Sequence, residues 1–119
     1  RYAYDVQNSP ENNQMQLDLI SEEFQEFCHA HADDWLGHNE SSTQSTEAHA
    51  LKELADLVYV CFQYAANREW DLLLALQRVH DSNMSKLGED GKPIRREDGK
   101  VLKGPNYKPP YLEDLCHLI

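Results

Sequence analysis

Two segments of this chain carry carboxylates three residues apart within stretches of helical periodicity, and this pattern constrains the fold most strongly. Glu22, Glu23 and Glu26 form the first cluster, and Glu53 and Asp56 form the second. Residues three apart share a helix face, so each segment presents paired acids to one side. If the two sides face each other, carboxylates about 4 Å apart repel by roughly 4 kcal/mol per pair at an effective dielectric near 20. Such a cluster requires a cation, and hard oxygen ligands favour Mg²⁺ or Mn²⁺.

Composition and charge limit which kind of protein this is and which partners it can bind. A length of 119 residues with 40% hydrophobic and 27% charged content suits one globular core, so we expect a single domain over residues 1–119. No apolar run reaches the roughly 20 residues of a membrane span and no signal-peptide pattern is present, which predicts a cytoplasmic protein. The net charge of −10 argues against nucleic-acid and membrane partners, because both require a basic footprint.

Positive charge is concentrated in one short segment. Seven of the eleven Lys and Arg residues lie within residues 86–108, which hold four acidic residues. An acidic part that holds metal and a basic segment that reaches phosphate would suit one small polyanionic ligand. A solvated charged hairpin would explain the same segment, and the charge pattern does not decide between them.

Helical periodicity predicts a helical core over about residues 10–87. Ser9-Pro10 is a helix-start signal, and the first helix is expected over about 10–32, followed by a loop over 33–45. Ser45 or Thr46 is expected to cap the second helix, which ends at a tight connection over 67–69. The third helix is expected over about 70–87, with Gly88 as its stop.

The second helix is apolar on two faces. Leu57, Val60 and Tyr64 form one face, and the other is a stripe made of Leu51, Leu54, Ala55, Val58, Cys61, Phe62 and Ala65. A helix that is apolar on two faces is buried on two faces. In so short a chain we expect the second covering layer to come from another subunit, which predicts a homodimer or homotetramer.

The character of the sequence changes after Gly88. Asp90-Gly91 and Asp98-Gly99 are turn signals, and a small β-hairpin is expected about the second of them. The hairpin and an extended arm occupy about residues 88–110, and a short helix is expected over 111–118. The predicted fold class is therefore all-α, a helical bundle with a small C-terminal β-hairpin.

Three motifs resemble the MazG-like, all-α nucleoside triphosphate pyrophosphohydrolases, a superfamily that includes phosphoribosyl-ATP pyrophosphatase and dimeric dUTPase. The resemblance covers about residues 17–110, and the tail through Lys103-Gly-Pro-Asn-Tyr107 is similar to the short phage and integron-borne members. The motifs are Leu-Ile-Ser-Glu22-Glu23-Phe-Gln-Glu26, Lys-Glu53-Leu-Ala-Asp56-Leu-Val-Tyr and His-Asp-Ser-Asn83-Met-Ser-Lys86.

The resemblance implies hydrolysis of (deoxy)nucleoside triphosphates to monophosphate and pyrophosphate, in a nucleotide-pool cleaning role. It implies that Mg²⁺, or alternatively Mn²⁺, is bound by Glu23, Glu26, Glu53 and Asp56, with Glu22 as a further ligand or nearby carboxylate. Glu23 or Glu26 is the candidate acceptor of the water's proton.

The resemblance also implies two substrate-binding residues. Asn83 and Lys86 would contact the phosphates or the sugar of the nucleotide. Apart from the resemblance, the basic segment suggests that Lys103 of the hairpin would meet phosphate oxygens. The candidates for stacking on the base are Trp35, Tyr59, Trp70 and Tyr107; each also suits a core or interface position, and the sequence does not choose among them. Without the resemblance, Asn83 would be interpreted as a surface amide. Lys86 would be interpreted as a cation that interacts favourably with the negative, C-terminal end of the helix dipole.

Two other classes remain open from the sequence. A non-catalytic helical interaction protein would keep the carboxylates as an acidic surface. A di-iron carboxylate bundle would use Glu26-Phe-Cys-His29 as a Glu-x-x-His motif, although that architecture requires a second such motif and the chain offers none.

Overall fold

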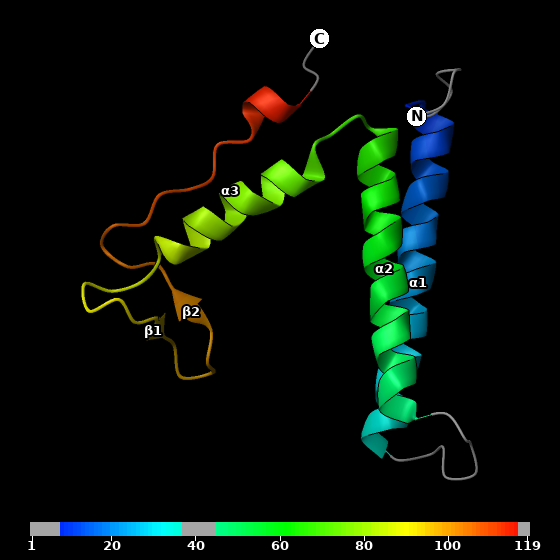
Figure 1. Ribbon diagram of the computed structural model, residues 1–119, viewed down its shortest axis with the longest axis horizontal. Helices are drawn as coiled ribbons and strands as arrows, with labels where there is room; N and C mark the ends of the chain where they lie inside the picture. The colour runs from blue at the N-terminus through cyan, green and yellow to red at the C-terminus, as the bar shows by residue number, and fades with distance from the viewer. Residues whose placement is uncertain (1–7, 37–44, 117–119) are drawn as a thin grey trace. The chain divides into compact units, whose positions relative to one another are not determined.

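The structure, a computed structural model, describes residues 8–36 and 45–116 and divides into two compact units, residues 1–69 and 70–119. The first unit contains α1 (Pro10–Leu36) and α2 (Thr46–Asn67), and the second contains α3 (Leu72–Met84), β1 (Ile94–Arg95), β2 (Val101–Leu102) and the 3₁₀ helix η1 (Glu113–Leu115) (Figure 1). The predicted all-α fold with a small C-terminal hairpin is confirmed. The single domain over residues 1–119 stays a prediction.

The first helix is longer than its sequence pattern indicated. Ser9 begins α1 as predicted, since its Oγ accepts a hydrogen bond from the Asn12 backbone N–H at 3.2 Å. The helix continues to Leu36, so the predicted end at about residue 32 and the predicted loop over 33–36 are wrong; residues 37–44 lie outside the described ranges. The polar last turn does not break the helix because Asp34 accepts a hydrogen bond from the Thr46 hydroxyl at 2.8 Å.

The two helices of the first unit run antiparallel, side by side (Figure 1). Side-chain amides join the start of α1 to the end of α2: Asn12 Nδ2 donates to Asn67 Oδ1 at 2.6 Å, and Asn67 Nδ2 donates to Asn13 Oδ1. At the other end, the contact between Thr46 and Asp34 joins the start of α2 to the end of α1. Ser45 caps α2 through its side chain, which accepts from the Ala48 N–H.

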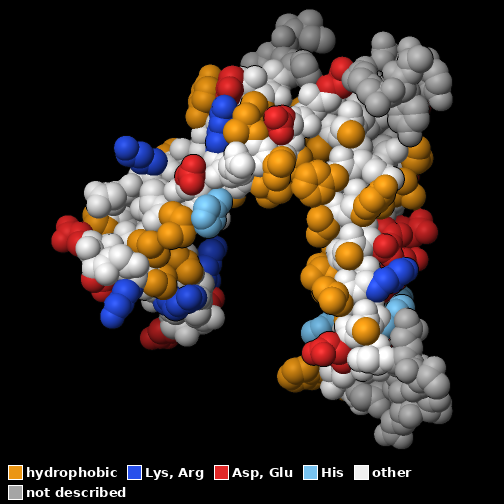
Figure 2. Space-filling view, in the orientation of Figure 1, with side chains coloured by type: hydrophobic (Ala, Val, Ile, Leu, Met, Phe, Trp, Pro, Cys, Tyr) orange, Lys and Arg blue, Asp and Glu red, His pale blue; other side chains and the backbone are white. Residues whose placement is uncertain are grey.

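Large apolar side chains of this unit lie at the surface. Among the described residues, the buried apolar residues are Ala30 and Ala65 alone, and Figure 2 shows hydrophobic side chains along the length of the helix pair. Leu57, Val60 and Tyr64 are half-buried, whereas the other apolar stripe of α2 is exposed at Leu51, Leu54, Val58 and Phe62. Tyr59, which follows Val58 in the chain, is exposed as well. No described helix is long and apolar enough to cross a membrane.

The third helix is shorter than predicted at both ends. Asp71 caps it by accepting a hydrogen bond from the Leu74 N–H at 3.0 Å, so α3 begins at Leu72 instead of residue 70. It ends at Met84, because the Ser85 hydroxyl donates to the Ser82 carbonyl at 2.6 Å and the chain tightens into three-residue turns. Gly88 is therefore not the helix stop; its N–H donates to the Lys92 carbonyl in the following turn.

The predicted hairpin is confirmed. Strands β1 and β2 pair antiparallel, with Ile94 opposite Leu102 and Arg95 opposite Val101. Gly91 and Gly99 have φ values of 76° and 91°, the left-handed conformation that both Asp-Gly signals predicted.

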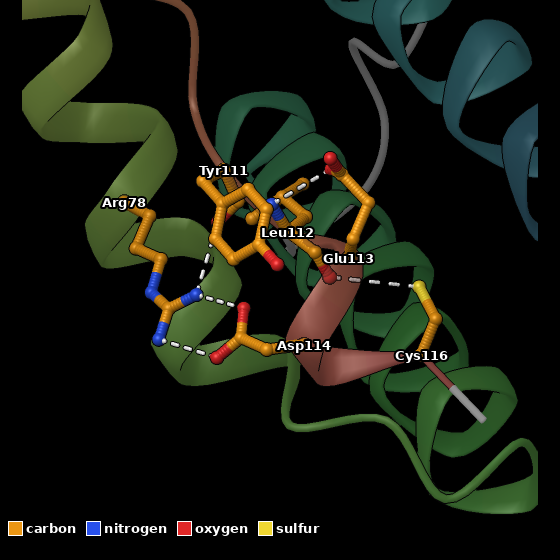
Figure 3. A network of polar contacts seen from close by, with 6 residues as sticks. All are labelled: Arg78, Tyr111, Leu112, Glu113, Asp114 and Cys116. Carbon is orange, nitrogen blue, oxygen red and sulfur yellow. Dashed lines mark hydrogen bonds and ion pairs between the residues drawn. The ribbon is translucent and has the colours of Figure 1, made fainter. Parts of the chain in front are cut away.

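Residues 108–116, the C-terminal strap, lie along α3. Ser82 donates to the Lys108 carbonyl at 2.7 Å. Arg78 donates to the Tyr111 carbonyl at 2.9 Å and to both oxygens of Asp114 at 2.6 and 3.1 Å (Figure 3). These contacts lie on both sides of Pro109-Pro110 and hold the segment along the helix. The predicted helix over 111–118 is consequently only the turn η1, and residues 117–119 lie outside the described residues.

Candidate metal centre

The structure brings the predicted carboxylates together. Oxygen atoms of Glu22, Glu23 and Glu26 lie within 4.8 Å of one another, and so do oxygen atoms of Glu23, Glu53 and Asp56. The first group lies on α1 alone, whereas the second joins α1 to α2. Glu23 belongs to both, so the five carboxylates form one continuous group, called here the acid cluster.

Glu53 is the buried member of the acid cluster. It is 6% exposed, and its Oε2 has no hydrogen-bond partner among the described residues. A buried carboxylate oxygen without a partner is costly, since it has lost its water and gained nothing in exchange. This oxygen, together with a donor set made only of carboxylates, fits a hard divalent cation such as Mg²⁺ or Mn²⁺.

The electrostatics of Glu23 reflect this crowding. Partial burial raises the pKa of the Glu23 carboxyl above its ordinary value, and the nearby charges of Glu26, Asp56, Glu53 and Glu22 raise that pKa further. Each neighbour acts in the same direction because a second negative charge disfavours ionisation. The arrangement therefore favours a positive charge at Glu23.

Lys52 contacts the acid cluster, and the sequence interpretation gave it no role. Its Nζ lies 2.7 Å from Asp56 Oδ2 and 3.5 Å from Glu53 Oε1. The hydrogen bond and charge of Asp56, with the charge of Glu53, raise the pKa of Lys52 above its ordinary value. The four-residue spacing from Lys52 to Asp56 was the available signal, because such pairs meet on a helix surface.

Two of the predicted substrate-binding residues lie at the end of α3, in the second unit. Asn83 is exposed in the last turn, and its carbonyl accepts a hydrogen bond from the Lys86 N–H at 3.1 Å. The arm passes directly against this turn: a Cβ on Gly104 would lie 2.5 Å from the carbonyl oxygens of both Lys86 and Leu87. Gly104 is therefore required by a close backbone approach, which the sequence interpretation missed.

Lys103 and Tyr107, the other two predicted substrate-binding residues, contact each other in this arm. The Lys103 Nζ lies 4.8 Å from the centroid of the Tyr107 ring, a cation–π arrangement. The Tyr107 N–H donates to the Gly104 carbonyl at 3.3 Å, which closes a turn between them. The second unit thus holds Lys86, Lys103 and Tyr107 around the Gly104 crossing.

The geometry does not favour a di-iron centre. Within the ranges 8–36 and 45–116, the two groups able to hold a metal consist of Asp and Glu, without a histidine. His29, the histidine of the Glu-x-x-His segment, is exposed and belongs to neither group.

Comparison with known families agrees with this architecture. Residues 3–83, more than half of the chain, match the family model described as phosphoribosyl-ATP pyrophosphohydrolase. The fold is that of the all-α, MazG-like pyrophosphohydrolases, a class of hydrolases that act on nucleotide-like substrates. The chain belongs to the phosphoribosyl-ATP pyrophosphohydrolase family.

Some of the candidate site residues lie inside the matched range and others lie after it. It contains all five carboxylates of the acid cluster and has Asn83 as its last residue, whereas Lys86, Lys103 and Tyr107 follow it. The predicted superfamily is thereby confirmed, and the short phage or integron subtype stays a prediction. No curated protein gave a significant match.

Proposed function

We propose that this protein is a Mg²⁺-dependent hydrolase that converts (deoxy)nucleoside triphosphates to monophosphate and pyrophosphate. The observation that carries the proposal is the meeting of Glu23 from α1 with Glu53 and Asp56 from α2, where a buried Glu53 oxygen has no hydrogen-bond partner among the described residues. Family membership supports hydrolysis that releases pyrophosphate. Standard or modified deoxynucleotides in a pool-cleaning role are the favoured substrates.

The acid cluster is assigned to metal binding. Glu23, Glu26, Glu53 and Asp56 are the proposed ligands, and Glu22 is a further ligand or a carboxylate that supports one. When bound, Mg²⁺ neutralises triphosphate oxygens, activates water and stabilises charge on the leaving pyrophosphate. Mn²⁺ suits the same donor set and is the alternative ion.

Glu23 or Glu26 is assigned as the acceptor of the attacking water's proton. A general base works best when its pKa lies near the working pH. The raised pKa of Glu23 moves that carboxyl in the required direction. Glu26 is its immediate neighbour on the same helix face and lies within the same 4.8 Å group.

The substrate's phosphates and sugar are assigned to Asn83, Lys86 and Lys103, and its base to Tyr107. The close crossing of Gly104 over the Lys86 carbonyl supports a concerted role for these residues. Charged hydrogen bonds to phosphate contribute roughly 1.5–3 kcal/mol each, so two lysines would account for a large part of substrate affinity.

A second copy of the chain is the proposed partner, in a homodimer or homotetramer. The support is the exposed apolar stripe of α2, which includes Leu51, Val58 and Phe62. Covering such a stripe removes apolar surface from water, which favours association.

The test is a panel of nucleoside and deoxynucleoside triphosphates, with phosphoribosyl-ATP included because the family description names it. Pyrophosphate release is measured with millimolar Mg²⁺ and again with EDTA. We expect Mg²⁺-dependent release from at least one triphosphate, and Glu53→Gln should abolish it by removing the buried ligand.

Three outcomes would contradict the proposal. Absence of release across the panel would favour the non-catalytic interaction protein, and release that persists in EDTA would remove the metal from the mechanism. Stoichiometric iron in the purified protein, with the corresponding near-ultraviolet colour, would favour the di-iron class instead.

A further inference from the structure

Lys52 is an isolated cation in a strongly acidic part of the chain. Residues 2–67 contain twelve Asp and Glu but a single Lys or Arg, which is Lys52. That one cation lies against the acid cluster, 2.7 Å from Asp56 Oδ2 and 3.5 Å from Glu53 Oε1. The backbone accounts for the contact with Asp56, because Lys52 lies four residues before Asp56 on α2 and Glu53 lies three residues before it, so Asp56 is the helix neighbour of both.

The ammonium group contacts the same carboxylates that are proposed to bind the metal. It neutralises one oxygen of Asp56 and one of Glu53, while Glu53 Oε2 keeps no hydrogen-bond partner among the described residues. The Lys52 side chain is 63% exposed, so it is able to leave the cluster for water. An exposed ion pair of this kind is weak and readily exchanged.

We propose that Lys52 is a built-in counter-cation that competes with the divalent metal for Asp56 and Glu53, and so sets the metal concentration at which the acid cluster fills. The inference rests on the metal centre proposed above. In the metal-free protein, Lys52 partly offsets the repulsion among the carboxylates. When a divalent cation binds, Lys52 moves away and its positive charge is released from the cluster.

Competition of this kind lowers the apparent affinity for the metal. A ligand that binds only the open form has an apparent dissociation constant equal to its intrinsic value divided by the fraction of protein that is open. Removing Lys52 therefore removes the competitor, and it also removes a positive charge that repels the incoming cation. Both effects predict tighter metal binding.

The test is calorimetric titration of Mn²⁺ into the full chain without nucleotide. We expect Lys52→Met to bind Mn²⁺ more than about twofold more tightly than the wild type. Lys52→Arg retains the charge and should bind no more tightly than the wild type. Arg68→Gln is the control for net charge, because it lies 16 residues further along the chain and about 24 Å along the helix axis at 1.5 Å per residue, which exceeds the screening length.

Thermal melting supplies an independent readout. In EDTA, Lys52→Met should melt below the wild type, because the acid cluster has lost its cation; in Mn²⁺ the difference should shrink or reverse. Circular dichroism at room temperature confirms that the variant, which changes an exposed side chain, is folded.

Two outcomes of the titration would contradict the proposed role of Lys52. If the wild type binds Mn²⁺ and Lys52→Met binds it within about twofold of the same affinity, or more weakly, competition by Lys52 is overturned and the metal centre stands. If neither protein binds Mn²⁺, the metal centre itself fails and the role of Lys52 fails with it.

Discussion

Glu23 is the residue at which the two carboxylate groups of the acid cluster meet, one within α1 and one across α1 and α2. Its position was predictable from the sequence, because Glu23 and Glu26 share a helix face and so do Glu53 and Asp56. The contact of Lys52 with the cluster had the same kind of local signal. The buried, unpaired Glu53 oxygen had none, since burial depends on how the two helices pack.

The charge on Glu23 predicts opposite effects of one substitution with and without metal. In EDTA, Glu23→Gln should raise the melting temperature, because it removes a partly buried carboxylate surrounded by like charges. The native state raises the pKa of Glu23, so this carboxyl lowers stability above that pKa and the penalty disappears as the pH falls below the unfolded value. The rise in melting temperature caused by Glu23→Gln in EDTA should therefore be present at pH 7 and absent at about pH 4.

Addition of Mg²⁺ should reverse the order, because the variant lacks a proposed ligand and gains less from the metal. Differential scanning calorimetry at both pH values, with EDTA or Mg²⁺, measures all four conditions. Glu89→Gln, which changes an exposed carboxylate in the other unit, is the control. A lower melting temperature for Glu23→Gln in EDTA would show that Glu23 is stabilising in the free protein and contradict this account.

Substitution of Lys86 should reduce turnover but leave the stabilisation by metal unchanged. Lys86→Ala should lower kcat/KM for the triphosphate by roughly 10- to 100-fold, the range expected for one charged hydrogen bond to phosphate. The metal-induced rise in melting temperature should remain, because Lys86 is not a ligand. Glu53→Gln should lose both, and full activity in Lys86→Ala would transfer phosphate recognition to Asn83, Lys103 or their neighbours.

At the scale of elements, the sequence predicted which segments are helical better than where the helices end. The three helices and the Asp-Gly hairpin have local signals, namely apolar spacing, capping residues and glycines with positive φ. The end of α1 depends on the distant contact of Asp34 with Thr46, and the C-terminal strap depends on Arg78. Contacts between residues far apart in sequence carry no periodicity, so these ends were beyond prediction from pattern.

The close backbone crossing at Gly104 predicts that adding one methyl group there lowers both stability and activity. Gly104→Ala would place Cβ 2.5 Å from the carbonyl oxygens of Lys86 and Leu87, so the arm must move. We expect a loss of roughly 1–3 kcal/mol in the free energy of unfolding, measured by urea denaturation. A reduced kcat/KM should accompany it, because the same movement displaces Lys86 and Lys103.

Gly99 supplies the matched control for this substitution. A Cβ there meets no atom within 4 Å, but the φ of 91° strains any other residue. Gly99→Ala should therefore lose stability through the hairpin turn without the loss of turnover expected at Gly104. Equal activity of the two variants would show that the close crossing does not position the lysines.

For the whole molecule, the shortage of buried apolar residues is the dominant observation. Among the described residues, the two buried apolar side chains are both alanines, and large side chains such as Trp35, Tyr59 and Leu51 are exposed. The two-faced pattern of α2 had predicted an apolar surface larger than one short chain covers. The sequence could not show which face is left exposed, because that depends on packing against α1.

Assembly follows as a prediction. Light scattering at micromolar concentration should report at least twice the 13.8 kDa mass of one chain. Tyr59→Glu, which places a charge next to Val58 of the exposed stripe, should lower the mass, whereas Tyr111→Glu changes a similarly exposed tyrosine of the C-terminal strap and should not. A wild-type monomer would mean that the chain covers its own stripe.

The side-chain contacts at the two ends of the helix pair have a consequence for how such a sequence is able to diverge. Sliding α1 past α2 by one turn, about 5.4 Å, would break the contacts of Asn67 with Asn12 and Asn13 and also the contact of Asp34 with Thr46. The helices are thus aligned by their own side chains. Changes in the length of the chain between Leu36 and Ser45 should therefore accumulate among descendants of this gene without moving Glu23 away from Glu53.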